Sequence, residues 1–493
     1  MNNTSCFDLR NALKILKTYT GELIGTDELV NPYAEIAGIY RYVGAGGTVK
    51  RPTRMGPAMI FNNVREYPNV KVLIGLLASR NRVAKILDTQ PEQLAFLLKN
   101  AVLTPMDPIT IPQEQAVCQE IVYRAKEPGF DIRKIIPMLT NTEEDAGPYI
   151  TMGIAYAMDE ETGKSDVTIH RLCIQGPDEI SMYFAPGRHL NLIRQKAEDD
   201  GKPLPITISI GVDPAIEIGT CFEPPTTPFG YNELAVAGSI RKRPVELVDA
   251  LTVQTKAIAN AEFVIEGELL PNIRIKEDHN THTGKAMPEF PGYTGMAQPA
   301  IPVIKVKAVT HRRNPIFQTV IGPSEEHVNL AGIPVEASIL TMVERAMPGK
   351  LKNVYAHSSG GGKYMAILQF QKSEPSDEGR QRQAALLAFA AFPELKHVIL
   401  VDEDVDIFDS NDVLWALNTR YQGDVSTVFI PGVRCHPLDP SQSPDFSYSI
   451  RNQGISCKVI FDCTVPFNLK DRFKRVAFKE IDLKRFSSLI LNK

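Results

Sequence analysis

Three side chains between residues 166 and 233 have the chemistry of a divalent-cation site. Asp166 belongs to residues 165–171, which alternate polar and apolar residues as a half-buried strand does. His189 follows a Pro-Gly turn, and Glu233 follows a proline-rich bend. Carboxylate oxygens and an imidazole nitrogen suit Mn²⁺ or Mg²⁺. The spacing leaves two interpretations open, a metal site or ordinary polar residues at strand ends.

A fixed cation and a candidate proton donor lie further along the chain. Arg171 closes the same predicted strand, and its guanidinium keeps its charge at physiological pH. Glu289 stands in an apolar stretch. Its neighbours are Met287, Phe290 and Tyr293, and apolar surroundings raise the pKa of a carboxyl group so that it stays protonated near neutral pH. A turn carboxylate on the surface is the other interpretation of Glu289.

Three more polar residues occupy loop or glycine-rich contexts. His327 follows two glutamates, Lys363 follows three glycines, and His436 precedes a proline. Each of them alone is more often structural or solvated than functional. As a set, they are candidates for contacting polar groups of a small substrate.

The pattern along the chain predicts a multidomain α/β fold. Residues 1–130 mix helices and strands, as in an α/β domain. Residues 131–322 contain repeated short alternating strands, which predict a barrel-like domain with one interposed helix at 244–259. Residues 323–464 alternate helices with buried strands, as a doubly wound domain does. The apolar residues of 465–493 cannot form a core alone, and we expect this tail to pack on a neighbouring domain or subunit.

Composition limits the classes of function. The 493 residues carry a net charge of −4, so no strong field attracts nucleic acid or an anionic membrane. Seven cysteines form no Cys-x-x-Cys pair, which argues against a disulfide framework and favours a reducing compartment. The N-terminus lacks the pattern of a secretory signal, and the longest apolar run, residues 384–392, is too short to span a bilayer. We therefore expect a cytoplasmic protein with neither a nucleic-acid nor a membrane partner.

Four motifs resemble those of a known family in order and spacing. They are Ser-Asp-Val-Thr-Ile-His-Arg at 165–171, Pro-Gly-Arg-His at 186–189, Gly-Tyr-Asn-Glu at 230–233 and Thr-Gly-Lys-Ala-Met-Pro-Glu-Phe-Pro-Gly-Tyr at 283–293. The chain is similar, over essentially its whole length, to the UbiD-like decarboxylases that use prenylated FMN. The similarity is greatest to the branch that acts on hydroxylated benzoic acids, the protocatechuate and gallate decarboxylases, and it extends to the acid-rich segment 402–409.

The resemblance implies a central split β-barrel that cradles the flavin phosphate. The cofactor-binding residues that it implies are Thr168, Ile169, His170, Arg171, Arg188, His189 and Glu233. It also implies that Asp166, His189 and Glu233 bind Mn²⁺ or Mg²⁺ beside the phosphate, with K⁺ as a further ion. The family commonly has Asn where this chain has Asp166.

The family also places one arginine and two glutamates at the cofactor ring. Arg171 matches the arginine, and Glu289 matches the second glutamate, which donates the proton. The first glutamate normally lies five residues earlier in a Pro-Glu-Gly, where this chain has Gly284. Glu277 and Asp278 are the two candidates to replace it, and the sequence leaves the choice open.

The implied reaction is the reversible, non-oxidative decarboxylation of a hydroxybenzoate, either protocatechuate to catechol or gallate to pyrogallol. Losing CO₂ from an aryl ring requires an electron sink that no side chain provides, and prenylated FMN is that sink. His327, Lys363 and His436 would then contact the substrate hydroxyl groups. The implied partners are a flavin prenyltransferase that supplies the cofactor and further copies of the chain in a homodimer or higher homo-oligomer.

Two interpretations from other functional classes stay open. A metal-dependent hydrolase or lyase without flavin would use Asp166, His189 and Glu233 to activate water, and it would be active as a colourless protein. A non-catalytic flavin-binding subunit would hold the cofactor and would tolerate the loss of Glu289.

Overall fold

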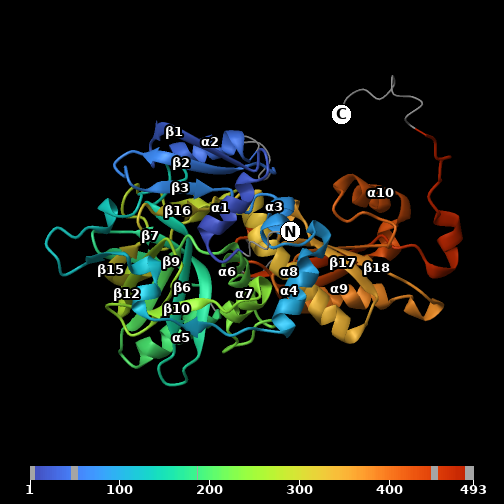
Figure 1. The fold of residues 1–493 in the computed structure, drawn as a ribbon. Helices are drawn as coiled ribbons and strands as arrows, with labels where there is room; N and C mark the ends of the chain where they lie inside the picture. Colours follow the sequence, from blue (N-terminus) through green and yellow to red (C-terminus); the bar gives the residue numbers. More distant parts are fainter. Residues whose placement is uncertain (1–5, 46–53, 186, 443, 446–453, 483–493) are drawn as a thin grey trace.

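Three α/β parts make up the structure, a computed structural model that describes residues 6–45, 54–185, 187–442, 444–445 and 454–482. In Figure 1 the N-terminal part is blue, the central barrel is green to yellow, and the C-terminal part is orange to red. The long helix α8 (Glu325–Ala346) lies where the three parts meet (Figure 1). The predicted multidomain α/β architecture is confirmed.

The N-terminal part is built on a four-stranded sheet of mixed direction. In spatial order its strands are β1 (Leu23–Val30), β2 (Ala58–Val64), β3 (Lys71–Ile74) and β16 (Ile316–Thr319). The helices of this part are α1 (Leu9–Lys17), α2 (Glu35–Val43), α3 (Arg80–Ile86) and α4 (Leu94–Leu103). Because β16 follows the barrel strands in the sequence, its parallel pairing with β3 ties the barrel to this sheet.

A closed six-stranded barrel forms the centre. In spatial order its strands are β12 (Phe263–Ile275), β9 (Leu204–Ile210), β6 (Tyr149–Met158), β7 (Ser165–Ile174), β8 (Glu179–Met182) and β15 (Ile301–His311). β12 also pairs with β15, which closes the ring, and β5 (Ile121–Arg124) is added to β15. The alternate residues Ile206, Ile208 and Ile210 of β9 are fully buried in one core cluster, as the period of two in a strand requires.

Several short elements surround the barrel and carry the residues of the site. The helices are α5 (His189–Asp199), α6 (Pro214–Gly219) and α7 (Glu233–Arg241), and a hairpin is formed by β13 (Lys285–Pro288) and β14 (Thr294–Met296). These elements hold side chains of the predicted site at one edge of the barrel.

The helix predicted at residues 244–259 is wrong. This stretch forms two strands, β10 (Glu246–Asp249) and β11 (Lys256–Ile258), which pair with each other, and β10 also pairs with β4 (Ile109–Thr110). Leu247 and Val248 are both buried although they point to opposite faces, so the apolar residues of this strand do not alternate with polar ones. A short apolar run that is buried on both faces cannot be told from a buried helix by its period alone.

The C-terminal part is a five-stranded sheet with helices. In spatial order its strands are β17 (Leu351–Ala356), β18 (Met365–Phe370), β19 (His397–Val401), β21 (Ile455–Asp462) and β20 (Thr427–Arg434). Besides α8, its helices are α9 (Arg380–Ala391), α10 (Ser410–Arg420) and α11 (Gly423–Ser426). The three central strands run parallel, as the predicted doubly wound arrangement requires, and the two edge strands pair antiparallel.

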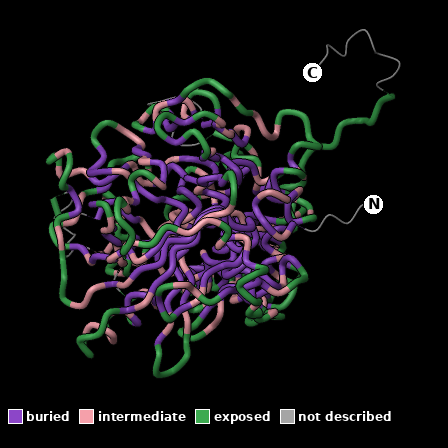
Figure 2. Tube along the Cα trace, turned by 60° about the vertical axis from the view of Figure 1, so that its left-hand side comes forward, coloured by how far each residue is buried: buried purple, intermediate pink, exposed green. Residues whose placement is uncertain are grey.

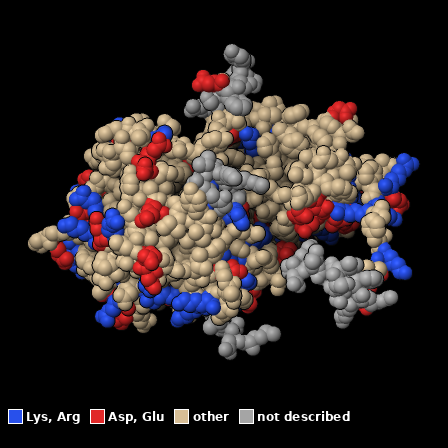
Figure 3. All heavy atoms as spheres, turned by 90° about the horizontal axis from the view of Figure 1, so that it is seen from above, with Lys and Arg blue, Asp and Glu red and all other residues tan. Residues whose placement is uncertain are grey.

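Figure 2 shows buried backbone concentrated in the interior strands and exposed backbone in the peripheral loops. On the face drawn in Figure 3, basic and acidic side chains intermingle, in keeping with the small net charge. Among the described residues, none of the helices combines the length and the apolar character needed to cross a lipid bilayer.

The chain after β21 runs along the outside of the C-terminal part. The Arg475 guanidinium lies 4.1 Å from the centre of the Trp415 ring and pairs with Asp412 at 2.8 Å. Val476 and Phe478 beyond it are 80% and 89% exposed. Residues 483–491, which also entered the prediction of a packing tail, lie outside the described residues.

Two buried carboxylates fasten α8 to the N-terminal part. Glu326 accepts hydrogen bonds from the backbone N–H groups of Gly75 at 2.6 Å and Leu77 at 3.2 Å. Glu336 accepts two N–H bonds from Arg80, at 2.8 and 2.7 Å. Because these contacts join segments about 250 residues apart in the sequence, they hold the start of α8 in register with the rest of the molecule.

We predict that Arg80→Met destabilises the protein strongly. The side chain of Glu336 is 1% exposed, and removing one partner of a buried ion pair costs about 3–5 kcal/mol because the other charge stays buried without compensation. The urea midpoint of unfolding measures the effect. Arg80→Met/Glu336→Met is the control, and it should recover part of the loss. An Arg80→Met midpoint equal to that of the wild type would contradict the prediction.

A second prediction concerns pH. Burial raises the pKa of Glu326 from its ordinary 4.5 to about 7, so the folded state binds a proton more tightly than the unfolded state does. The stability gained from this proton is fully present below pH 4.5 and is lost as the pH rises through 7. Glu326→Gln does not titrate. Its stability relative to wild type should therefore rise by about 3 kcal/mol between pH 4.5 and 8, as urea unfolding can measure. The exposed Glu28→Gln should show no such slope, and a pH-independent difference for Glu326→Gln would refute the prediction.

Candidate active site

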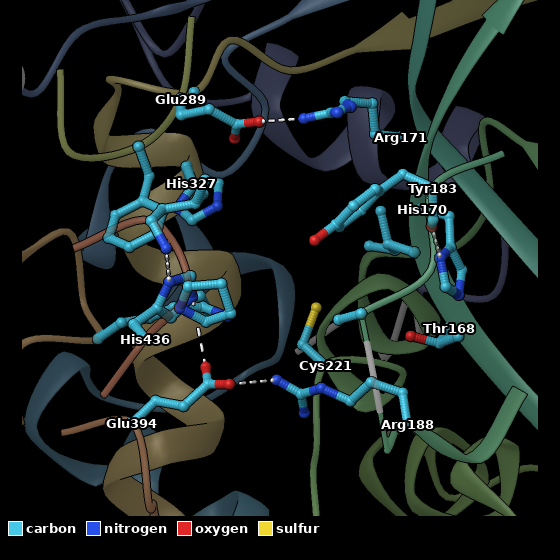
Figure 4. Close-up of a pocket in the computed structure, with 18 of the residues that line it drawn as sticks. Thr168, His170, Arg171, Tyr183, Arg188, Cys221, Glu289, His327, Glu394 and His436 are labelled. Atoms are coloured by element: carbon cyan, nitrogen blue, oxygen red, sulfur yellow. Dashed lines mark hydrogen bonds and ion pairs between the residues drawn. The ribbon is translucent and has the colours of Figure 1, made fainter. Parts of the chain in front are cut away.

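One cavity of about 670 Å³ lies between the barrel, the β13–β14 hairpin, α8 and the C-terminal part. All the predicted site residues line it: Asp166, Thr168, Ile169, His170, Arg171, Arg188, His189, Glu233, Glu289, His327, Lys363 and His436. Figure 4 shows Arg171 and Glu289 at one end of the cavity, with Arg188 and Glu394 at the other. Pro186, from the turn before His189, lies outside the described residues.

The Arg171 guanidinium lies between two carboxylates. Nη1 donates to Glu289 Oε1 at 2.8 Å, and Nη2 donates to Glu277 Oε2 at 2.9 Å. The carboxylate left open by the sequence is therefore Glu277. Asp278 instead accepts three backbone N–H bonds within its own turn, including one from Gly284 at 2.8 Å.

Two further donors distinguish the carboxylates around Arg171. Glu277 is fully buried and also accepts from the Tyr149 hydroxyl at 3.1 Å and the Gln298 N–H at 2.8 Å. Burial by itself lowers the pKa of the Arg171 guanidinium. The carboxylates of Glu277 and Glu289 outweigh this effect, so the pKa of Arg171 is raised. The arginine also lies 4.7 Å from the centre of the Tyr183 ring, a cation–π contact.

Glu289 follows β13 at the tip of the hairpin and faces the cavity. Its side chain is 16% exposed, so the interpretation as a surface turn residue is wrong. Burial raises the pKa of Glu289 more than the Arg171 charge lowers it. Tyr293 is 65% exposed and contributes little to this burial. A Cβ on Gly295 would lie 2.8 Å from Glu289 Cγ, so a glycine is needed there to leave the carboxyl its place.

Asp166, His189 and Glu233 come together at the start of two helices. Asp166 lies on β7, His189 begins α5, and Glu233 begins α7 after its N-cap Asn232. One potential ligand atom from each of the three lies within 4.8 Å of the other two. Burial and the Asp166 charge raise the pKa of Glu233, and its Oε2 has no hydrogen-bond partner among the described residues. Two acids and an imidazole in this arrangement fit a divalent cation.

The predicted cofactor residues of β7 line the cavity. His170 donates its Nδ1–H to the Tyr183 carbonyl at 2.9 Å, and burial lowers its pKa, so the ring is neutral. Arg188 precedes α5 and pairs with Glu223 and, at 3.1 Å, with Glu394. A guanidinium beside the metal ligands fits a phosphate group.

The C-terminal side of the cavity carries the remaining predicted residues around the Phe290 ring. His327 is stacked on this ring at 5.1 Å, and His436 meets it edge-on at 4.9 Å. Burial and the Lys363 charge lower the pKa of His327 to about 3 and that of His436 well below its ordinary value. Both imidazoles are therefore neutral. The Lys363 ammonium lies 3.6 Å from Glu223.

A glycine makes this arrangement possible. Gly361 has φ of +63°, and a Cβ there would lie 2.2 Å from Phe290 Cδ2. Only glycine therefore lets the loop before Lys363 approach the Phe290 ring.

Tyr183, Glu223 and Glu394 are among the cavity residues that sequence reasoning missed. No motif marks them. The signal that could have pointed to Glu394 is its place in the short loop between α9 and β19, since functional side chains are often on loops. Its burial, with 5% of the side chain exposed, is visible only in the tertiary structure.

Comparison with known proteins gives the family. The three domain models of the UbiD family, described as the N-terminal, Rift-related and C-terminal domains of 3-octaprenyl-4-hydroxybenzoate carboxy-lyase, match residues 16–101, 110–325 and 328–463. The chain is 56% identical to the gallate decarboxylase of Lactiplantibacillus plantarum, covering 96% of this chain and 97% of the relative.

Two solved structures are also similar. One is the apo structure of a 3,4-dihydroxybenzoic acid decarboxylase from Enterobacter cloacae, with 59% identity, a TM-score of 0.92 and coverage of 98% of this chain and 99% of that one. The other is an evolved dimeric form of the UbiD-class enzyme HmfF from Pelotomaculum thermopropionicum in complex with prFMN, with 32% identity, a TM-score of 0.83 and coverage of 97% and 100%. The resemblance deduced from the four motifs is confirmed, and the chain belongs to the UbiD family of carboxy-lyases.

Proposed function

We propose that this protein decarboxylates a hydroxylated benzoic acid, protocatechuate to catechol or gallate to pyrogallol, with prenylated FMN as cofactor. The observation that carries the proposal is the pairing of Arg171 with Glu277 and Glu289 at one end of a cavity that also holds the metal-ligand set. The relatives named for gallate and 3,4-dihydroxybenzoate decarboxylation, at 56% and 59% identity, support the substrate class.

The residues along β7 and at Arg188 would hold the flavin, and Asp166, His189 and Glu233 would hold Mn²⁺ or Mg²⁺ at its phosphate, with K⁺ as a further ion. When bound, prenylated FMN supplies the electron sink that lets CO₂ leave an aromatic ring. The unpartnered Glu233 Oε2 supports the metal assignment, because a buried carboxylate oxygen without a donor is costly.

Arg171 and Glu289 have different roles at the ring carbon that bears the carboxylate. The charged Arg171 orients the substrate carboxylate, and Glu277 fixes the position of the guanidinium by accepting a hydrogen bond from Nη2. Glu289, whose raised pKa favours the protonated form, gives its proton to the ring carbon after CO₂ has left. In the reverse direction the same carboxylate removes that proton, so carboxylation at high bicarbonate uses the same groups.

His327, Lys363 and His436 contact the ring hydroxyl groups of the substrate. Neutral imidazoles and one ammonium are suited to binding phenolic oxygen. They lie around Phe290, which provides an apolar surface for an aromatic ring.

Two partners complete the proposal. A flavin prenyltransferase supplies the cofactor, because nothing in the proposed chemistry makes it. The protein forms a homodimer or a higher homo-oligomer, and support comes from the dimeric form described for the related HmfF and from the exposed Val476 and Phe478 near the C-terminus.

The functional test is CO₂ release from protocatechuate and from gallate by protein purified anaerobically after co-expression with a flavin prenyltransferase. Glu289→Gln should keep its flavin absorbance and lose activity by about 10²–10⁴-fold, the usual contribution of a general acid. Glu144→Gln is the matched control, because this exposed acid pairs with Lys285 on the same hairpin.

Other outcomes would point to other functions. Metal-dependent activity in flavin-free protein would favour a hydrolase or lyase. Bound flavin without CO₂ release from either substrate would favour a non-catalytic flavin-binding subunit. Full activity of Glu289→Gln would leave the reaction in place and remove Glu289 as the proton donor.

The metal set gives another prediction. Asp166→Ala should lose most of its Mn²⁺ in elemental analysis, because two ligands remain of three. Mn²⁺ should raise the melting temperature of the wild-type protein and leave that of the variant unchanged, because only the folded wild type binds the ion tightly. The exposed Asp200→Ala is the control. Equal Mn²⁺ content in Asp166→Ala and wild type would show that the ion binds elsewhere.

A further inference from the structure

Glu394 and His436 lie next to each other in the cavity wall, at the end away from Glu289 (Figure 4). Glu394 Oε2 is 3.3 Å from His436 Nε2, and the two side chains are 5% and 9% exposed. The other oxygen, Oε1, accepts from Arg188 at 3.1 Å. Oε2 has no well-aligned hydrogen bond from any described residue, although it is buried. It is therefore an acceptor that can still take a well-aligned donor.

The His436 ring has a defined tautomer. The Leu438 backbone N–H donates to His436 Nδ1 at 3.1 Å, so Nδ1 carries the lone pair. Burial and the Lys363 charge keep the ring neutral. Its single hydrogen is consequently on Nε2, beside Glu394 Oε2. A donor and an acceptor placed side by side are complementary to a hydroxyl group, which accepts from the first and donates to the second.

Buried Lys458 and half-buried Lys396 hold the two loops that carry this pair. Lys458 Nζ donates to the carbonyls of Pro393, at 2.6 Å, and Leu395, on either side of Glu394. Lys396 Nζ donates to Asp439 at 3.1 Å and to Ser441 at 2.6 Å in the loop after His436. Because both loops are held, the pair is positioned before any ligand binds.

A second set of polar groups lies close by. His327 is stacked on the same Phe290 ring that His436 meets edge-on. Its Nδ1 is buried and has no hydrogen-bond partner among the described residues. Two unsatisfied polar sites around one aromatic ring match two neighbouring oxygens on a bound aromatic substrate.

We propose that the Glu394–His436 pair binds the ring hydroxyl meta to the substrate carboxylate, and that Glu394 thereby determines specificity for substrates with vicinal hydroxyls. This inference rests on the proposed function and adds a residue and a substrate preference to it. A phenolic hydroxyl bound to a carboxylate makes a charge-assisted hydrogen bond. A substrate that lacks this hydroxyl leaves the buried Glu394 oxygen unpaired, which is a strong basis for rejection.

The test compares kcat/KM of the holoenzyme for protocatechuate and 4-hydroxybenzoate, which differ only in the second hydroxyl. The wild type should prefer protocatechuate by at least about 100-fold, since sites built to bind a hydroxyl reject analogues without it. Glu394→Gln should reduce this preference at least about tenfold, chiefly by raising KM for protocatechuate, because the charge-assisted bond is lost. Glu403→Gln, an acid of the same domain outside the cavity, should leave the preference unchanged.

The inference is overturned if Glu394→Gln lowers kcat/KM for protocatechuate and 4-hydroxybenzoate by the same factor, since Glu394 would then act only through Arg188. It is also overturned if Glu394→Gln leaves both values as they are in the wild type. Wild-type protein that decarboxylates neither substrate nor gallate would instead overturn the proposed function, so the two failures are distinct.

If the variants lose their flavin, the inference can still be tested with the wild-type holoenzyme. Calorimetry then measures the affinity for the two products, catechol and phenol. Catechol should bind at least about tenfold more tightly than phenol, because the single hydroxyl of phenol leaves one of the two polar sites unpaired. Equal affinity for the two products would also overturn the inference. Glu394→Asp, which keeps the charge beside Arg188 and withdraws the carboxylate from His436, should lose the preference as Glu394→Gln does.

Discussion

The shared ion pair of Arg171 with Glu277 and Glu289 is the constraint on which the site depends. One guanidinium faces two carboxylates where little water reaches, so the group would carry a net negative charge if both acids were ionised. The raised pKa of Glu289 relieves this excess by favouring a proton on one of them. The same burial that makes the charges costly thus prepares an acid for proton transfer.

The hydrogen bonds also distinguish the two acids. Glu277 is held by three donors, Tyr149, Gln298 and Arg171. Among the described side chains, Glu289 accepts a hydrogen bond from Arg171 alone, and it stands on a short hairpin that faces the cavity. The two carboxylates therefore have different tasks, although they share a partner.

The two sides of the cavity differ in charge because different parts of the fold build them. The barrel side presents Arg171 within β7, and Arg188 and the acid-rich metal set near the starts of β7, α5 and α7. The C-terminal side presents neutral imidazoles packed on Phe290 and the carboxylate of Glu394. The helix α8 fixes the distance between these sides, since Glu326 and Glu336 fasten it to the N-terminal part while its first turn carries His327. Arg171 on the barrel side suits a substrate carboxylate, and the neutral imidazoles around Phe290 suit ring hydroxyl groups.

The sequence by itself determined the α/β architecture, the strand that carries Arg171 and the positions of the motif residues, because periodicity and turn chemistry are local properties. Local patterns failed at residues 244–259, where burial on both faces of β10 removed the alternation that marks a strand. Only the tertiary structure decided that Glu277, rather than Asp278, meets Arg171, and that Glu394 stands beside His436. Both are contacts between segments distant in the chain, and the burial that gives these carboxylates their chemistry is created only when those segments pack together.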